Sequence, residues 1–167
     1  MSLPPPRSAD AATGAAAAPF SLRLRVYWED TDAGGVVFYA NYLKFFERAR
    51  TEWLRAHGHG QQRLREETGA IFVVTDTALR YFAPARLDDL IDVTVRVLHA
   101  GRVRLEFAQQ AWRGDTLLAE GRLRIGCVDA GTFRPRRIPI ELSFADRSLG
   151  PAAAPGDVSL SDSGPGA

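Results

Sequence analysis

The stretch that decides the fold is residues 39–57, YANYLKFFERARTEWLRAH. Apolar side chains recur there at steps of three and four residues, which is the spacing of one face of an α-helix. The members of this stripe are Tyr42, Phe45, Phe46, Ala49, Trp53 and Leu54. The intervening charged residues predict an outer face of Lys44, Arg48, Arg50, Glu52 and Arg55. We therefore predict a helix from about Tyr39 to His57 whose wide apolar stripe must be covered by other elements.

Strand patterns flank this helix on both sides. Before it, Leu22, Leu24 and Val26 alternate with polar residues, the two-residue period of a half-buried strand. After it, a short second helix at 61–68 precedes four segments rich in β-branched, aromatic and other apolar residues, at 71–82, 90–100, 102–112 and 116–128. Turn signals separate the last three, which predicts an antiparallel meander. The order predicts an α+β hotdog fold, in which a five-stranded antiparallel sheet wraps around one long central helix.

Composition indicates an ordinary globular protein of one domain. The 167 residues are 46% hydrophobic and 25% charged, and the net charge of +1 creates no field that would attract nucleic acid or an anionic membrane. Residues 1–20 and 146–167 are rich in Pro, Gly, Ala or Ser and are predicted to be disordered tails around a folded unit at 21–145. Because a single helix covers only one face of the sheet, we expect two or more copies to associate.

Cysteine usage and hydropathy predict a cytoplasmic protein. Cys127 is the one cysteine, so the chain has no intramolecular disulfide and no thiolate metal site, and Cys127 is expected to be a small core residue. There is no apolar run long enough for a transmembrane helix, and the first residues do not form a secretory signal.

The loop before the helix has the greatest chemical content. It reads Glu-Asp-Thr-Asp-Ala-Gly-Gly at 29–35, and Asp32 precedes Tyr39 by seven residues. A helix N-terminus carries unpaired N–H groups and a partial positive charge, so it can hold a developing oxyanion beside such a carboxylate. Taken alone, however, Asp30, Thr31 and Asp32 are more typical of helix caps and Asx-turns.

Other site classes fit the sequence poorly. A calcium loop starting at Asp30 would have Asn41 in place of the final Glu. His57 and His59 have no third ligand nearby, so no metal is predicted. No Gly-x-Ser-x-Gly elbow, GxGxxG or Walker sequence occurs, and we expect no cofactor.

The stretch YWEDTDAGGVVFYANYLKFFERARTEWL at 27–54, together with YFAPARLDDL at 81–90, resembles the 4-hydroxybenzoyl-CoA thioesterase family. The resemblance is strongest to its Tol-Pal-associated acyl-CoA thioesterases and extends to about Leu142. It implies hydrolysis of a short or medium acyl-CoA, or of an aryl-CoA, to the free acid and CoA. It also favours a catalytic role for the acidic loop over simple capping.

The resemblance further implies roles for individual residues. Asp32 is the expected catalytic carboxylate, as a nucleophile through a mixed anhydride or as a general base on water. The backbone N–H of Tyr39 is expected to polarise the thioester carbonyl. Glu47 falls where relatives carry an acidic residue near the site, although an ion pair across helix turns is the alternative. Many Tol-Pal-associated members have His where this chain has Tyr39, and the aryl-CoA branch has Tyr, so acyl and aryl substrates both remain open.

Binding partners follow from the same resemblance. Arg86, Arg102 and Arg104 are candidate contacts for CoA phosphates, with a solvated surface role as the alternative. We expect the chain to form a homodimer or homotetramer and to have an acyl carrier protein as a partner.

A dehydratase or hydratase of the same fold would need a His base, which this loop lacks. A non-catalytic module that binds acyl-CoA or acyl carrier protein, linked to envelope or phospholipid machinery, is the alternative function and would tolerate loss of the Asp32 carboxylate.

Overall fold

The computed structural model describes residues 19–140. Apart from positions 19 and 20, the predicted tails at 1–20 and 146–167 lie outside these residues, and their disorder stays a prediction. The elements in chain order are β1 (Phe20–Arg25), a 3-10 helix η1 (Trp28–Asp30), α1 (Asn41–Ala56), α2 (Gln61–Thr68), β2 (Ala70–Tyr81), β3 (Leu90–Ala100), β4 (Arg104–Arg113) and β5 (Thr116–Asp129).

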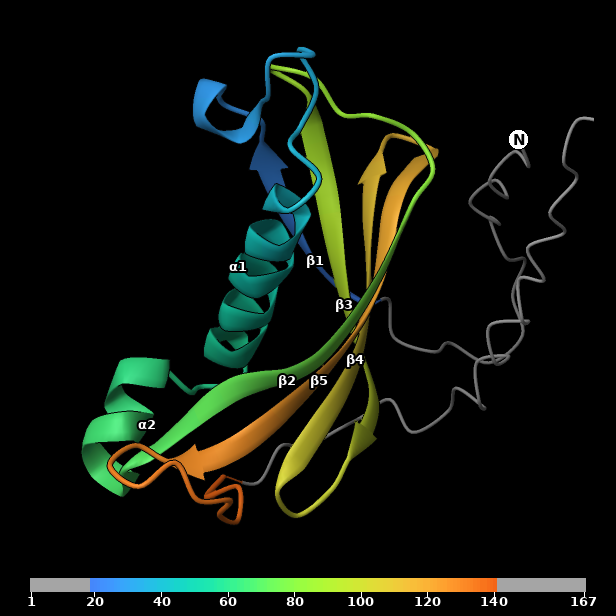
Figure 1. Ribbon diagram of the computed structural model, residues 1–167. Helices are drawn as coiled ribbons and strands as arrows, with labels where there is room; N and C mark the ends of the chain where they lie inside the picture. Colours follow the sequence, from blue (N-terminus) through green and yellow to red (C-terminus); the bar gives the residue numbers. More distant parts are fainter. Residues whose placement is uncertain (1–18, 141–167) are drawn as a thin grey trace, which may run out of the picture.

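The five strands form one antiparallel sheet in the order β1-β3-β4-β5-β2. Strands β3, β4 and β5 are the predicted meander, whereas β1 and β2 occupy the two edges. The sheet curves around α1 (Figure 1), which confirms the predicted α+β hotdog arrangement. Strand β4 begins two residues later than predicted, because residues 101–103 form the turn that the Gly101 N–H closes on the Arg104 carbonyl at 2.9 Å.

Helix α1 presents its apolar stripe to the sheet and packs against β1 and β3. All six predicted stripe residues are buried, and Phe45, Phe46 and Ala49 have no exposed surface. The helix begins at Asn41 rather than Tyr39, because the Asn41 N–H bonds to the Phe38 carbonyl at 2.8 Å and closes a turn first. Among residues 19–140, neither helix is long and apolar enough to cross a bilayer.

The prediction that Arg50 lies on the outer face of the helix is wrong. Its guanidinium is directed at the sheet, where it donates to the Gln109 side-chain oxygen at 2.7 Å, and the Gln109 amide donates to the Phe46 carbonyl at 3.0 Å. Burial lowers the pKa of Arg50 to about 10. The physical reason is helical spacing: Arg50 lies four residues after Phe46 and three before Trp53, so it borders the buried stripe and its long stem reaches inward.

Gly121 allows α1 and β2 to approach β5 closely. A Cβ added at this position would lie 2.6 Å from Phe46 Cε2 and 2.8 Å from Leu79 Cδ2. Both distances are far below van der Waals contact, and the Phe46 ring has no exposed surface and so has little room to move. Only glycine fits this point of the sheet.

We expect Gly121→Ala to lower the free energy of unfolding by about 1–3 kcal/mol, because overpacking forces neighbouring side chains from their preferred rotamers. Urea denaturation monitored by tryptophan fluorescence measures the change. Gly126→Ala on the same strand is the matched control, since a Cβ there would approach no closer than 3.3 Å, to a threonine methyl group. Equal destabilisation of the two variants would contradict this packing argument.

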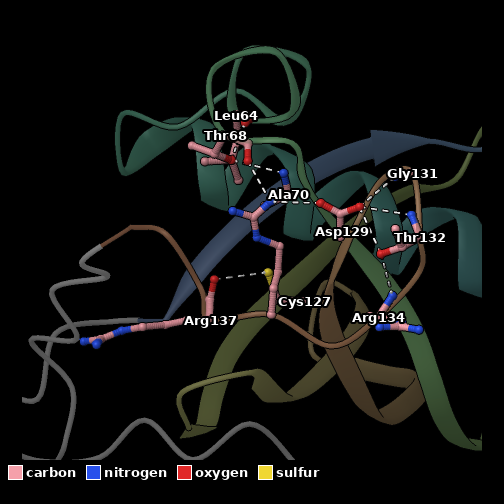
Figure 2. A network of polar contacts seen from close by, with 10 residues as sticks. Leu64, Thr68, Ala70, Cys127, Asp129, Gly131, Thr132, Arg134 and Arg137 are labelled. Atoms are coloured by element: carbon pink, nitrogen blue, oxygen red, sulfur yellow. Dashed lines mark hydrogen bonds and ion pairs between the residues drawn. The ribbon is translucent and has the colours of Figure 1, made fainter.

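A polar network fixes the chain where β5 ends (Figure 2). Asp129 Oδ1 accepts hydrogen bonds from the Gly131 N–H at 3.1 Å and from the Thr132 N–H and hydroxyl at 3.0 and 3.1 Å. These bonds, those of Thr132 first, lower the pKa of the Asp129 carboxyl. Arg136 joins Asp129 to the C-terminal end of α2 by donating to the Thr68 carbonyl at 2.7 Å. Cys127 is buried nearby, as predicted for a small core residue.

Candidate active site

The acidic loop folds as a tight hairpin between β1 and α1. Thr31 and Val37 form an antiparallel bridge, and the Asp32 N–H donates to the Val36 carbonyl at 2.9 Å. The Gly35 N–H returns to the Asp32 carbonyl at 3.0 Å, and Gly35 has a φ of 73°, which favours glycine. The hairpin therefore presents Asp32 at its tip and returns the chain directly to the start of α1.

Asp32 has one carboxylate oxygen available for chemistry. Its side chain is exposed, and Oδ1 accepts a hydrogen bond from the Gly34 N–H at 2.8 Å. This is the Asx-turn that the loop composition favours. Among residues 19–140, no group bonds to the second oxygen, so the turn orients the carboxylate without occupying it.

Asp30 has a different position from Asp32, although both belong to the same acidic run. It is 2% exposed, and its carboxylate accepts the Tyr27 N–H at 2.9 Å. Its carbonyl accepts the Phe38 N–H at 2.9 Å, so Asp30 ties together the two arms of the hairpin. Of the two aspartates, Asp30 supports the loop and Asp32 faces the solvent.

Tyr39 lies in the turn that leads into α1. Its N–H makes no hydrogen bond with any other described residue, whereas its carbonyl accepts one from the Tyr81 hydroxyl at 3.0 Å. The helix that follows adds the partial positive charge of its N-terminus. A free N–H at this point is a suitable donor to an oxyanion.

Glu47 is not brought to the hairpin by any contact within the described part of the chain. It is exposed on α1, and its carboxylate accepts a hydrogen bond from the Thr51 hydroxyl at 2.7 Å, one turn further along the helix. This contact is a hydrogen bond across one helix turn, and the site role of Glu47 stays a prediction.

Arg86 lies at the same end of the molecule as the hairpin. It follows Ala85, whose carbonyl accepts the Val37 N–H at 2.8 Å. The Arg86 N–H donates to Asp89 Oδ2 at 2.8 Å, and Arg113 donates to the same oxygen at 2.6 Å. Desolvation raises the pKa of the Asp89 carboxyl, but these hydrogen bonds outweigh it and hold the pKa below its ordinary value. The Arg86 side chain is exposed, and its charge also lowers the pKa of the Asp89 carboxyl.

Arg102 and Arg104 lie at the opposite end of the sheet, at the turn between β3 and β4 (Figure 1). Strand β3 starts near the hairpin, beside Arg25, and its 11 residues end at Ala100. At about 3.3 Å per residue the strand separates the two ends by roughly 30 Å. The predicted phosphate role of these two arginines therefore requires that the active site of a second copy lie near them.

Tyr81 begins the stretch at 81–90 that carries the family resemblance, but the sequence pattern gave it no role, and the fold brings it to the site. It ends β2 and lies 42 residues from Tyr39, whose carbonyl it contacts. No local spacing links residues so far apart, and only the pairing of β2 with β5 fixes their approach. Within residues 19–140, no three His, Cys, Asp or Glu side chains are grouped as metal ligands.

A carboxylate with a free oxygen, such as that of Asp32, can act as a nucleophile or a base. A backbone N–H at a helix start, such as that of Tyr39, can donate to the oxyanion.

The model of the thioesterase superfamily matches residues 34–120. The acyl-CoA thioesterase YbgC of Haemophilus influenzae is 44% identical over 130 residues, which is 78% of this chain and 96% of that protein. The chain belongs to the thioesterase superfamily. The acyl-CoA thioester hydrolase YbgC of Escherichia coli O6:H1 is 45% identical over 121 residues, covering 72% of this chain and 90% of the relative.

Two solved structures have the same fold. A probable thioesterase from Bartonella henselae superposes with a TM-score of 0.69 at 32% identity, over 73% of this chain and all of that one. The 1,4-dihydroxy-2-naphthoyl-CoA thioesterase Slr0204 from Synechocystis superposes with a TM-score of 0.68 over 73% of this chain and 90% of that one. At 22% identity this second match concerns the fold alone. The predicted thioesterase family and hotdog fold are thus confirmed.

Proposed function

We propose that this protein hydrolyses acyl-CoA or aryl-CoA thioesters to the free acid and CoA, with Asp32 and the Tyr39 N–H at the centre of the site. The observation that carries this proposal is the loop at 31–39, in which the hairpin presents the Asp32 carboxylate with one free oxygen and the turn after it leaves the Tyr39 N–H unpaired among the described residues. Both YbgC relatives are named for hydrolysis of acyl-CoA thioesters, which supports the choice of substrate class.

The free oxygen of Asp32 suits two versions of the reaction. As a nucleophile it attacks the thioester carbonyl carbon, the C–S bond breaks, and the CoA thiolate leaves and is protonated; water then hydrolyses the mixed anhydride and restores the carboxylate. As a general base it removes a proton from water while the water oxygen attacks the same carbon; the C–S bond then breaks, and the leaving CoA thiolate takes up that proton, which restores the carboxylate. In both versions the carbonyl oxygen becomes negative, and the Tyr39 N–H donates to it.

Release of free thiol from a panel of thioesters tests this function. The panel contains short, medium and long aliphatic CoA esters, benzoyl-CoA, 4-hydroxybenzoyl-CoA and an acylated acyl carrier protein. We expect turnover on at least one member, and the preferred member names the acyl or aryl group and its carrier. Absence of turnover on every ester, with acyl-CoA still bound, would overturn the enzyme assignment in favour of a binding module.

The panel also distinguishes aliphatic from aryl thioesters, the two substrate classes that Tyr at position 39 leaves open. The rings of Phe38 and Tyr39 have centroids 4.6 Å apart and are 41% and 64% exposed, so they form an aromatic surface directly before α1. Aromatic rings stack favourably on one another, which supports an aryl-CoA as one of the substrates.

We also propose that the protein is a homodimer joined through β2. This strand is a sheet edge of 12 residues, interrupted by one bulge between Val74 and Asp76, and a long edge is a template for pairing with another strand. Val74 in its middle is 54% exposed, although it pairs with the buried Ile125. We expect light scattering to give at least twice the mass of one chain, and Val74→Lys to shift the protein toward the monomer. A monomeric wild type would exclude this arrangement.

The proposed location is the cytoplasm. Reducing compartments keep an unpaired thiol such as that of Cys127 in its reduced form.

A further inference from the structure

The Tyr39 carbonyl lies directly before α1, so it has no hydrogen-bond partner within the helix. In an α-helix this carbonyl would accept the N–H of Leu43, but that N–H bonds to the Ala40 carbonyl at 3.1 Å. The Tyr81 hydroxyl takes its place at 3.0 Å. The peptide that follows Tyr39 is therefore held by a side chain from β2 and not by the helix itself.

Tyr81 is well placed to hold this peptide firmly. Its backbone pairs with Ala119 of β5, so the ring projects from the sheet. The ring meets Tyr42 edge-on at a centroid distance of 5.6 Å and Tyr39 at 6.5 Å with an interplanar angle of 88°. Desolvation, with a smaller contribution from Tyr39, raises the pKa of Tyr81, so the hydroxyl keeps its proton at neutral pH.

We propose that Tyr81 is a positioning residue of the active site, whose hydroxyl holds the Tyr39 carbonyl and so restrains the backbone of Tyr39, including the preceding peptide that carries the free N–H. The inference rests on the proposed function, in which this N–H donates to the oxyanion. A donor must point at the oxygen that develops negative charge, and small errors in direction weaken catalysis more than substrate binding. Tyr81 itself does not touch the reacting atoms in this scheme.

Tyr81→Phe tests the proposal, because it removes only the hydroxyl and leaves the ring contacts with Tyr39 and Tyr42. We expect kcat on the preferred ester to fall about fivefold to tenfold, while KM stays within about twofold. Tyr27→Phe is the matched control: Tyr27 is 59% exposed and its hydroxyl bonds to no described residue, so its kcat should equal that of the wild type. A wild-type kcat for Tyr81→Phe would overturn the proposal.

A double-mutant cycle separates positioning of the N–H from a general structural role. In the second background the Tyr39 amide is replaced by an ester, which has no N–H. If Tyr81 acts through that N–H, Tyr81→Phe changes kcat by less than about twofold there. An equal fall in both backgrounds would show that Tyr81 acts elsewhere and would overturn the proposal while the oxyanion role of Tyr39 stands. If the ester alone has wild-type kcat, the oxyanion role fails, and this inference fails with it.

Discussion

Asp32→Asn is expected to reduce thiol release from the preferred ester by about a hundredfold or more, on the order of 3 kcal/mol of transition-state stabilisation. An amide oxygen is neither a competent nucleophile toward a thioester nor a base for water, so both versions of the mechanism lose their central group. Asparagine has the shape of aspartate and can still accept the Gly34 N–H, so the hairpin should persist.

Kinetics at matched concentrations of folded protein measure this effect. Asp115→Asn is the control. Asp115 is an exposed aspartate in the turn between β4 and β5, and its replacement by asparagine removes the same single negative charge. Binding of the ester to Asp32→Asn should persist, since the carboxylate acts in the chemical step. Turnover unchanged by Asp32→Asn would eliminate both mechanisms, and the search for the catalytic group would then move away from the hairpin.

Replacement of the Tyr39 backbone amide by an ester is expected to lower kcat by about a hundredfold, the usual effect of removing one oxyanion-hole donor. The substitution is made by inserting the α-hydroxy acid analogue of tyrosine at position 39, so the side chain is unchanged and only the N–H is lost. Because this N–H bonds to no described residue, the fold loses no donor, but the Phe38 carbonyl that accepts the Asn41 N–H at 2.8 Å becomes a weaker acceptor. The loss should therefore appear mainly in catalysis, with a small decrease in stability.

Thermal unfolding and kcat measured on the same preparation distinguish these outcomes. An ester at Gln61, the first residue of α2, controls for the incorporation method and should leave kcat unchanged, because the Gln61 N–H also bonds to no described residue and the Gly60 carbonyl accepts the Leu64 N–H at 2.9 Å. If the ester at position 39 retains full activity, the donor to the oxyanion is another group, and the free N–H of Tyr39 has no part in the reaction.

Much of the fold was predictable because its signals are local. The stripe of α1 and the alternation of the strands depend on residues two to four positions apart, which sequence spacing reports directly. The predicted segments at 61–68 and 90–100 coincide with α2 and β3. The ends of α1 and β4 were less accurate, since turn bonds such as that from Asn41 to Phe38 displace the start of a regular element.

The sequence by itself determined the class of fold, the family and the loop that carries the candidate carboxylate. Tertiary structure alone decided which aspartate of that loop is exposed, that Arg50 turns toward the sheet, and that Tyr81 holds the Tyr39 carbonyl. It also separated Arg86 from Arg102 and Arg104 by the length of β3. The contacts of Arg50 and Tyr81 join residues 59 and 42 positions apart. Spacing along the chain does not encode such pairs, because they form only when the sheet closes around the helix.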